Sequence, residues 1–422
     1  MTAALKAYHG LARLFHGLAP GLLKKRVTQG KEDPERFTER LGITATVRPQ
    51  EPLVWFHGVS VGESLSAIPV IERLRARRPG IAVLITTATT TSAEILARRL
   101  PAGVIHQFAP IDTPQAVTAF LDHWRPDLAV FIESDIWPNL LRTLSARNIP
   151  HVLLSARITE KTFRGWQAFR GAMRQLLGGY RLIMAQDDAS DARLKAMDVA
   201  TGPHANLKVL GAPLKVDTEA LTALSALVDG RRVILAASTH YGEDSLIARA
   251  LEPWIRDGDL LVLVPRHPIK AADIRLDIEA LGLHVAQRSR KEAISPLIHV
   301  YLADTLGELG LFFSLADLVI MGGSFLTGIG GHNPLEAARL GKAVITGPDI
   351  GNWEGIFESL VTTGGAWEVA GPRELAFLVE QLRTAPAAIR AADASALAVS
   401  KEEAGTLDRV WTALEPLVPP CP

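Results

Sequence analysis

Short apolar runs alternate with amphipathic stretches along most of this chain. The runs are rich in Val, Ile and Leu and are bounded by polar or turn-forming residues, so they predict buried strands. In the first half, strands are expected at 53–57, 81–85, 128–132, 151–154, 182–185 and 209–210, with helices at 67–77, 92–100, 117–124 and 140–147. In the second half, strands are expected at 233–237, 260–264, 299–302, 318–321 and 343–345.

This alternation is typical of α/β domains that are built on a parallel sheet. The series is interrupted at Gly211-Ala212-Pro213 and then starts again. We therefore expect two Rossmann-like domains that face each other across a cleft, an N-terminal domain over 27–215 and a C-terminal domain over 216–422. Ligands of such sheets bind beyond the carboxyl ends of the strands, so the residues that follow each strand are the first candidates for a functional site.

Composition narrows the class of protein. The chain has 422 residues, which is long for a single hydrophobic core and agrees with two domains. Its 45 basic and 45 acidic residues balance, so the net charge does not favour a nucleic-acid-binding protein. The single cysteine, Cys421, excludes a disulfide framework and a cysteine-based metal cluster, and no apolar run is long enough to cross a bilayer.

Residues 1–26 form a separate segment that is both amphipathic and basic. Apolar residues recur at helical spacing at Leu5, Tyr8, Leu11, Phe15, Leu18 and Leu22, and basic residues are found at Lys6, Arg13, Lys24, Lys25 and Arg26. No acidic residue precedes Glu32. One interpretation is a helix that lies on an anionic membrane surface. The other is a helix packed on its own domain, and the pattern fits both.

A strand, a glycine-rich loop, a helix and a second strand follow one another between Asp317 and Pro348. The helix begins at Asn333-Pro334-Leu335-Glu336. Glycines let a backbone approach a phosphate, a helix N-terminus attracts anions, and the Glu336 carboxylate could accept hydrogen bonds from ribose hydroxyls. The same residues are also a favourable helix start, with Asn at the N-cap, Pro at N1 and Glu closing a capping box, so capping alone would explain them.

Polar residues also follow most of the other predicted strands. The clusters are Gly58–Glu63, Glu133–Asn139 and Ser155–Arg157 in the first half, and Ser238–His240, Arg266-His267 and Asp304–Glu308 in the second. Each cluster has a local structural explanation; Ser60 and Glu63, for example, fit a capping box. Together, on the one edge of each sheet where ligands bind, they predict a functional site.

These clusters belong to longer segments that are shared with a known family. The segments are WFHGVSVGE at 55–63, TTATTTSAE at 86–94, ESDIWPN at 133–139, SARITEKT at 155–162, STHYGED at 238–244, PRHP at 265–268, DTLGELGLFF at 304–313, GGSF at 322–325 and GGHNPLEAARLGKAVITGP at 330–348. In this order they resemble the 3-deoxy-D-manno-octulosonic acid (Kdo) transferases of lipopolysaccharide synthesis. The resemblance spans nearly the whole chain.

The resemblance implies a GT-B fold and an inverting glycosyltransferase that moves Kdo from CMP-Kdo to the lipid A precursor, lipid IVA. It further implies a peripheral or monotopic protein at the cytoplasmic face of the inner membrane. CMP-Kdo would be a substrate, so no cofactor and no bound metal are expected. The expected partners are CMP-Kdo, the lipid A precursor and an anionic membrane surface, and not nucleic acid.

Site residues are carried over only where the motifs match. Glu63 matches the catalytic base of the family, and Glu133 and Lys215 match positions that stabilise the transition state. The residues that match donor-binding segments are Arg266, His267, Leu306, Gly307, Glu308, Ser324, Asn333, Pro334, Leu335 and Glu336. These roles fit the chemistry, because a sugar hydroxyl needs a base to take its proton and a departing phosphate needs positive charge beside it.

The chain also departs from the family pattern. It has Asp135 where Glu is usual, Ser155 where Asn is usual, Asp349 where His is usual, and Gly211-Ala212-Pro213-Leu214-Lys215 where Gly-Asn-Leu-Lys is usual. Most departures lie in the acceptor half or near the hinge. Two alternatives stay open, a sugar-nucleotide epimerase on the same fold and a non-catalytic relative that binds a CMP-sugar or a lipid. The SVGE and IWPN segments favour the transferase, and retention of Glu63 argues against a non-catalytic protein.

Overall fold

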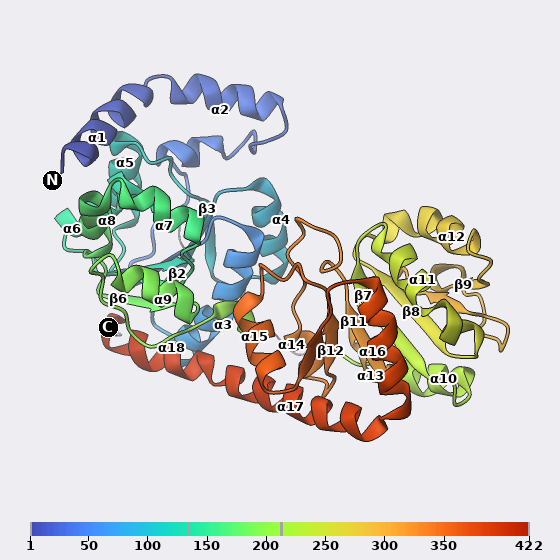
Figure 1. Ribbon diagram of the computed structural model, residues 1–422. Helices are drawn as coiled ribbons and strands as arrows, with labels where there is room; N and C mark the ends of the chain where they lie inside the picture. The colour runs from blue at the N-terminus through green and yellow to red at the C-terminus, as the bar shows by residue number, and fades with distance from the viewer. Residues whose placement is uncertain (1, 134–135, 212–213, 421–422) are drawn as a thin grey trace. The chain divides into compact units, whose positions relative to one another are not determined.

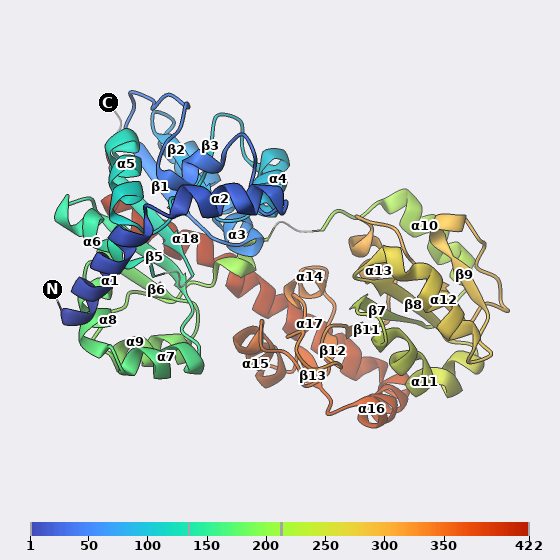
Figure 2. The same ribbon diagram turned by 90° about the horizontal axis from the view of Figure 1, so that it is seen from above.

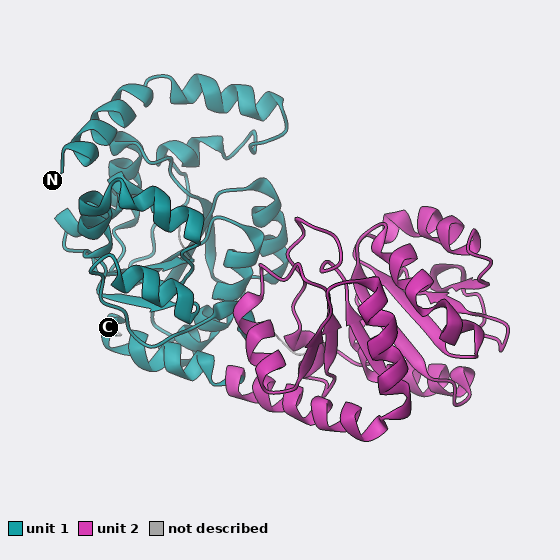
Figure 3. Ribbon diagram, viewed as in Figure 1, with its two compact units in different colours: residues 1–211, 404–422 teal, residues 212–403 magenta. Residues whose placement is uncertain are grey.

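The computed structural model describes residues 2–133, 136–211 and 214–420 (Figure 1). Contacts divide the chain into two compact units, which we call unit 1 (residues 1–211 and 404–422) and unit 2 (residues 212–403; Figure 3). Each unit contains one parallel sheet flanked by helices, which confirms the predicted α/β class.

The sheet of unit 1 has the strand order β3-β2-β1-β4-β5-β6, and its strands are parallel. The strands are β1 (Leu53–His57), β2 (Ala82–Thr87), β3 (Ile105–Phe108), β4 (Leu128–Ile132), β5 (His151–Ala156) and β6 (Leu182–Ala185). The chain builds one half of the sheet outward from β1 and then crosses to β4 to build the other half. In sheets of this order, ligands bind where the winding reverses, which here is at the carboxyl ends of β1 and β4.

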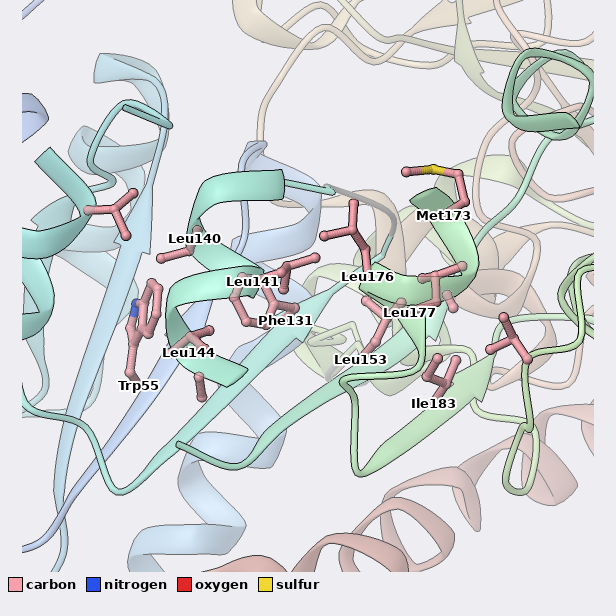
Figure 4. Packing of buried hydrophobic residues seen from close by; sticks show 14 of the residues in the cluster. Trp55, Phe131, Leu140, Leu141, Leu144, Leu153, Met173, Leu176, Leu177 and Ile183 are labelled. Atoms are coloured by element: carbon pink, nitrogen blue, oxygen red, sulfur yellow. The ribbon is translucent and has the colours of Figure 1, made fainter. Parts of the chain in front are cut away.

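Helices pack on both faces of this sheet because successive strand residues point to opposite sides. Leu53 and Trp55 of β1 belong to an apolar cluster with α5, α6 and α8, part of which is shown in Figure 4. Val54 and Phe56 belong to the opposite cluster, with α3, α4 and α18. The helices of unit 1 are α1 (Ala3–Phe15), α2 (Ala19–Thr28), η1 (Phe37–Leu41), α3 (Val61–Arg77), α4 (Thr90–Arg99), α5 (Pro114–Trp124), α6 (Pro138–Ala146), α7 (Glu160–Gln167), α8 (Arg170–Leu177), α9 (Asp188–Lys195), η2 (Leu207–Leu210), α18 (Thr406–Leu414) and η5 (Glu415–Leu417).

The sheet of unit 2 has the order β13-β12-β11-β7-β8-β10-β9, again with parallel strands. The strands are β7 (Val233–Thr239), β8 (Leu260–Pro265), β9 (Val285–Gln287), β10 (Val300–Leu302), β11 (Leu318–Met321), β12 (Val344–Thr346) and β13 (Ala366–Glu368). The winding reverses between β7 and β11, so the carboxyl ends of these two strands mark the ligand position of unit 2.

Helices also flank the sheet of unit 2. Apolar residues of α11, α12 and α16 form one cluster with residues of β7, β8 and β11. The helices are α10 (Thr218–Val228), α11 (Glu243–Arg256), η3 (Pro268–Lys270), α12 (Ala271–Glu279), η4 (Arg288–Arg290), α13 (Leu309–Leu315), α14 (Leu335–Ala338), α15 (Glu354–Thr362), α16 (Pro372–Thr384) and α17 (Pro386–Ala404).

The structure corrects three expectations. Val209 and Leu210 belong to the 3-10 helix η2 and not to a strand. Strands β3, β9 and β13 were not predicted, because they have only three or four residues and contain polar positions. Residues 404–422 were assigned to the second domain, but they pack on unit 1, where α18 buries Val410, Trp411 and Leu414 in the same cluster as α3.

The N-terminal segment forms two helices, α1 and α2, that lie along unit 1 (Figure 1, Figure 2). Part of this segment packs against the rest of unit 1, because Leu5 is buried and Tyr8 donates a 3.0 Å hydrogen bond to Asp112. The outer face is nevertheless apolar and open to solvent, since Leu11, Leu14 and Leu18 are 68%, 78% and 66% exposed. Packing on its own domain is therefore confirmed for part of this segment, and binding to a membrane surface stays a prediction. No helix in the described residues is long and apolar enough to span a bilayer.

Candidate functional site

Glu63 lies in the first turn of α3, directly beyond the carboxyl end of β1. Its Oε1 accepts a 2.7 Å hydrogen bond from the Ser60 hydroxyl, and its Oε2 accepts a 2.7 Å bond from the Val59 backbone N–H. Ser60 is the N-cap and accepts in return from the Glu63 N–H at 3.3 Å. The predicted cap is thus formed, and it orients the carboxylate at the position where the winding of the sheet reverses.

Glu133 follows β4 at the same edge of the sheet and has a left-handed backbone with φ 64°. This conformation is costly for a residue with a side chain and tends to be retained at functional sites. The Glu133 carboxylate forms a 2.7 Å ion pair with Lys208 of η2. Ser155, near the end of β5, also has a positive φ of 58°, and its hydroxyl accepts the Leu207 N–H at 3.2 Å, which fixes η2 beside β5.

The sequence analysis did not single out Lys208 and named Lys215 as the lysine of the site. The structure places Lys215 in unit 2 and pairs Glu133 with Lys208. A signal was present, because Asn206-Leu207-Lys208 contains the Asn-Leu-Lys letters that were sought at 211–215. Of the departures from the family pattern, Asp135 and Pro213 lie outside the described residues.

In unit 2, two glycines let β11 and its following loop pack closely against neighbouring residues. A Cβ on Gly322 would lie 2.6 Å from the Cα of Thr239, at the end of β7. Gly323 has φ +73°, and a Cβ there would lie 2.7 Å from Cδ2 of His332. Larger side chains would push the glycine-rich loop away from both groups.

The carboxylate of Glu243, at the start of α11, holds the ends of β7 and β11 together. It is fully buried. Its Oε2 accepts the backbone N–H groups of His240 at 2.8 Å and Gly323 at 2.7 Å, and its Oε1 accepts that of Phe325 at 2.9 Å. One side chain therefore ties the glycine-rich loop to the end of the neighbouring strand.

Three histidines and one arginine gather at this edge. The Nε2 atoms of His240 and His332 lie 3.0 Å apart, and the two rings are nearly parallel, with an interplanar angle of 6°. His267 packs edge-on against His240, with ring centroids 5.5 Å apart. Burial lowers the pKa of His332 to about 4, and the charges of His240, Arg266 and His267 act in the same direction.

Glu336 lies in α14, within the electrostatic reach of Arg266. Burial raises the pKa of its carboxyl group, while Arg339 and Arg266 lower it. The predicted capping box is only half formed: the Asn333 side chain accepts the Leu335 N–H at 3.0 Å, but no described residue donates a hydrogen bond to the Glu336 carboxylate. Capping therefore explains Asn333, and it leaves the carboxylate of Glu336 available to a ligand.

The remaining residues predicted to bind the sugar donor differ in how many of their polar groups already bond to other residues of the protein. Leu306 is 83% exposed and Gly307 has a positive φ of 87°, so this turn is open to solvent. The Glu308 carboxylate is occupied by Arg288 and Thr305. The Ser324 hydroxyl is buried between the Met321 carbonyl and the Gly347 N–H, at 2.7 and 2.8 Å, and therefore joins β11 to β12.

Comparisons with known proteins agree in one family. A family model described as 3-deoxy-D-manno-octulosonic-acid transferase (kdotransferase) matches residues 35–217. A protein of Arabidopsis thaliana named as a probable mitochondrial 3-deoxy-D-manno-octulosonic acid transferase is 33% identical over 374 residues, which cover 85% of this chain and 84% of that protein. The chain belongs to the Kdo transferase family. The 3-deoxy-D-manno-octulosonic acid transferase of Rickettsia bellii is 30% identical over 382 residues, which cover 90% of this chain and 90% of that protein. The enzyme of the same name from Bordetella pertussis is 33% identical over 401 residues, which cover 90% of this chain and 91% of that protein.

Solved structures define the fold of this family member as GT-B. A glycosyltransferase of Rickettsia africae aligns with a TM-score of 0.60 at 13% identity, covering 87% of this chain and 98% of that one. MurG of Acinetobacter baumannii aligns with a TM-score of 0.54 at 12% identity, covering 87% of this chain and 99% of MurG. A UDP-GlcNAc 2-epimerase of Neisseria meningitidis aligns with a TM-score of 0.55 at 15% identity, covering 85% of this chain and 100% of the epimerase. Because epimerases share the fold, family membership and not the fold identifies this chain as a glycosyltransferase.

We expect Glu243→Gln to lower the free energy of unfolding by about 1–3 kcal/mol. An amide NH₂ in place of either oxygen would face a backbone N–H, leaving that buried donor unpaired. Glu374→Gln is the matched control, because Glu374 is exposed and accepts one backbone N–H, from Ala370 at 2.8 Å. Urea unfolding of both variants measures the difference, and equal values would contradict the role of Glu243 as the tie between β7 and β11.

Proposed function

We propose that this protein transfers Kdo from CMP-Kdo to the lipid A precursor lipid IVA, with inversion at the anomeric carbon and without a cofactor or a metal ion. The observation that carries the proposal is the 33% identity, over 374 residues, to a protein named for Kdo transfer. The arrangement of residues supports it, because each unit presents polar side chains at the edge of its sheet where ligands of parallel sheets bind.

In this proposal Glu63 is the catalytic base. Ser60 and the Val59 N–H hold its carboxylate in one orientation at the end of β1. A sugar hydroxyl attacks the anomeric carbon of Kdo only if its proton is removed as the new bond forms, and a positioned carboxylate can accept that proton. The Glu133–Lys208 pair lies at the neighbouring strand, and we assign to it the stabilising role that the sequence analysis gave to Glu133 and Lys215.

The nucleotide is proposed to bind in unit 2. Glu336 is available to accept hydrogen bonds from ribose hydroxyls, and Arg266 supplies positive charge beside it. The Leu306-Gly307-Glu308 turn would contribute backbone groups, because the Glu308 carboxylate is already occupied. His267 and Asn333–Leu335 complete the predicted contact segments.

A lipid acceptor is supported by the surface of α1 and α2. A cavity of about 510 Å³ lies beside these helices and is lined by Phe15, Ala19, Leu22, Leu23, Lys25, Arg26, Gln29, Glu32, Arg40, Ala88 and Ile111. Apolar walls with basic residues among them suit an amphiphile that carries both acyl chains and phosphate groups. The proposed location is the cytoplasmic face of the inner membrane, where the protein would be bound at the surface.

The direct test is an assay with purified protein, CMP-Kdo and lipid IVA, with the products weighed by mass spectrometry. We expect Kdo addition by the wild type and about 100- to 10,000-fold slower transfer by Glu63→Gln. Glutamine also fits a capping box, so the variant removes the charge of the base and keeps the helix cap. Near-normal turnover by Glu63→Gln would mean that Glu63 is only a cap.

We expect Glu336→Ala to weaken CMP affinity by about 1–3 kcal/mol, because ribose hydroxyls would lose their acceptor in a half-buried site. Thermal stability should change little, since Asn333 and not Glu336 caps the helix. Asn333→Ala is the matched comparison, and loss of its cap should lower stability by about 1 kcal/mol. Calorimetric titration and thermal unfolding of both variants separate the roles. A stability loss in Glu336→Ala with unchanged CMP affinity would support capping.

We expect the double variant Lys24→Glu, Lys25→Glu to weaken binding to anionic vesicles by about 2 kcal/mol or more, because each basic residue at such a surface contributes about 1 kcal/mol. Arg26 is left unchanged, because it forms a 3.0 Å ion pair with Glu32. The control is Arg249→Glu, Arg373→Glu, which reverses two exposed charges of unit 2. Vesicle sedimentation at low and high salt measures the effect, and equal pelleting of both variants would rule out Lys24 and Lys25 as the anchor.

A further inference from the structure

His240 and His332 lie at the point where the winding of the unit 2 sheet reverses. His240 directly follows β7, and His332 lies in the loop after β11. Ser238, in β7, has a positive φ of 57°, and the register of β7 with β8 shifts at this residue. The irregular strand end and the Glu243 carboxylate together hold His240 beside His332. Strain and a buried carboxylate are thus used to bring two imidazoles together.

The contact between these rings allows the pair to gain one proton without separating. A hydrogen bond between two Nε2 atoms, here 3.0 Å apart, requires one N–H and one lone pair. A further proton can be added at an Nδ1 atom while this bond is kept. Neither Nδ1 atom has a hydrogen-bond partner among the described residues, so both remain free to bind a ligand.

Several charged groups act on the pair from the elements packed around it. Burial lowers the pKa of His240, Glu243 opposes this shift, and His267 and Arg266 reinforce it. Burial, the charge of His240, and the charges of Arg266 and His267 lower the pKa of His332. Burial and the neighbouring positive charges therefore favour the neutral form of both rings. The three imidazoles do not form a metal site either, since the described residues contain no group of His, Cys, Asp and Glu side chains arranged to hold a metal ion.

We propose that His240 and His332 form an anion-binding site that takes the phosphate of a nucleoside monophosphate together with one proton from solvent. The inference rests on the proposed function, because that function makes CMP the ligand of unit 2. A negatively charged phosphate beside the pair favours the protonated, positively charged imidazole. Binding of the phosphate therefore raises the proton affinity of the pair. The site then has two positive groups, Arg266 and the protonated pair.

The same proton uptake would assist the transfer reaction. The bond between the anomeric carbon of the sugar and the phosphate oxygen breaks, and its electron pair remains on the phosphate, which changes from one negative charge to two. The acceptor oxygen bonds to the anomeric carbon, and its proton passes to Glu63. The negative charge that develops on the leaving phosphate is thus stabilised by the protonated histidine pair beside it. His240 and His332 are binding groups in this step and do not attack the sugar.

A purely structural role for the pair gives a different result. His332 lies beside Gly323 and the His240 ring bonds to His332, so loss of both rings would loosen the loop next to Gly323. If the pair only holds the loop in place, its replacement changes stability or CMP affinity by the same factor at every pH. A proton-binding site links CMP affinity to pH and makes the measured binding heat depend on the buffer.

The experiment is calorimetric titration of the full-length protein with CMP at pH 7.5, in buffers that differ in their enthalpy of ionisation. We expect the wild type to take up a clear fraction of a proton, up to about one per CMP. The double variant His240→Gln, His332→Gln should take up none, although its side chains can still bond to each other. The matched control is His284→Gln, His299→Gln, which alters a second histidine pair of unit 2, with ring centroids 5.1 Å apart, and should keep the uptake.

A second measurement uses the wild type alone and does not depend on how well the variants fold. Between pH 7 and 9 the charge of CMP is constant, because a phosphate monoester loses its second proton near pH 6. Its dissociation constant should rise over this range by up to about tenfold per pH unit, whereas the affinity of cytidine, which lacks the phosphate, should stay flat. CMP binding without proton uptake, or uptake that persists in the double variant, would overturn the role of the pair and leave the proposed donor standing. A wild type that does not bind CMP would overturn both proposals.

Discussion

The buried carboxylate of Glu243 is the interaction on which the donor side of this protein depends. Backbone N–H groups beyond the ends of two strands would otherwise be buried without partners, at the place where the glycine-rich loop has to leave the sheet. By accepting three of them, Glu243 fixes His240, Gly323 and Phe325 relative to one another. The positions of His332 and Arg266 beside this framework follow from it, because His332 packs on Gly323 and Arg266 bonds through its N–H to the Thr239 carbonyl at 2.8 Å.

Much of the fold could be predicted from the periodicity of apolar residues. Nearly all residues of the central strands β1, β4, β7, β8 and β11 are buried and most are apolar, so their pattern predicts strands clearly. The edge strands β3, β9 and β13 are short and partly polar, and only their neighbours stabilise them as strands. The docking of α18 on unit 1 was not predicted either, because the apolar residues of this helix do not by themselves indicate which sheet they cover.

A position at the edge of the sheet was predictable where a residue directly follows a strand and belongs to a motif, as Glu63 and Arg266 do, and the roles of these residues stay predictions. The local geometry was not predictable where it depends on the backbone. Glu133, Ser155 and Ser238 all have positive φ angles at or next to the carboxyl ends of strands, and nothing in their residue types indicates this. The hydrogen bond between the Leu207 N–H and Ser155 holds η2 where Lys208 reaches Glu133, a contact that no motif in the sequence indicated.

The return of the last residues to unit 1 has a consequence for the order in which the protein is made. Unit 2 is an insertion between two parts of unit 1, so the face of the first sheet that carries α3 lacks Val410, Trp411 and Leu414 until the residues that follow unit 2 have been made. During synthesis unit 2 has its whole sequence before unit 1 does. A ribosome that stops after residue 403 would release a chain whose second unit is whole and whose first unit exposes an apolar face to chaperones and proteases.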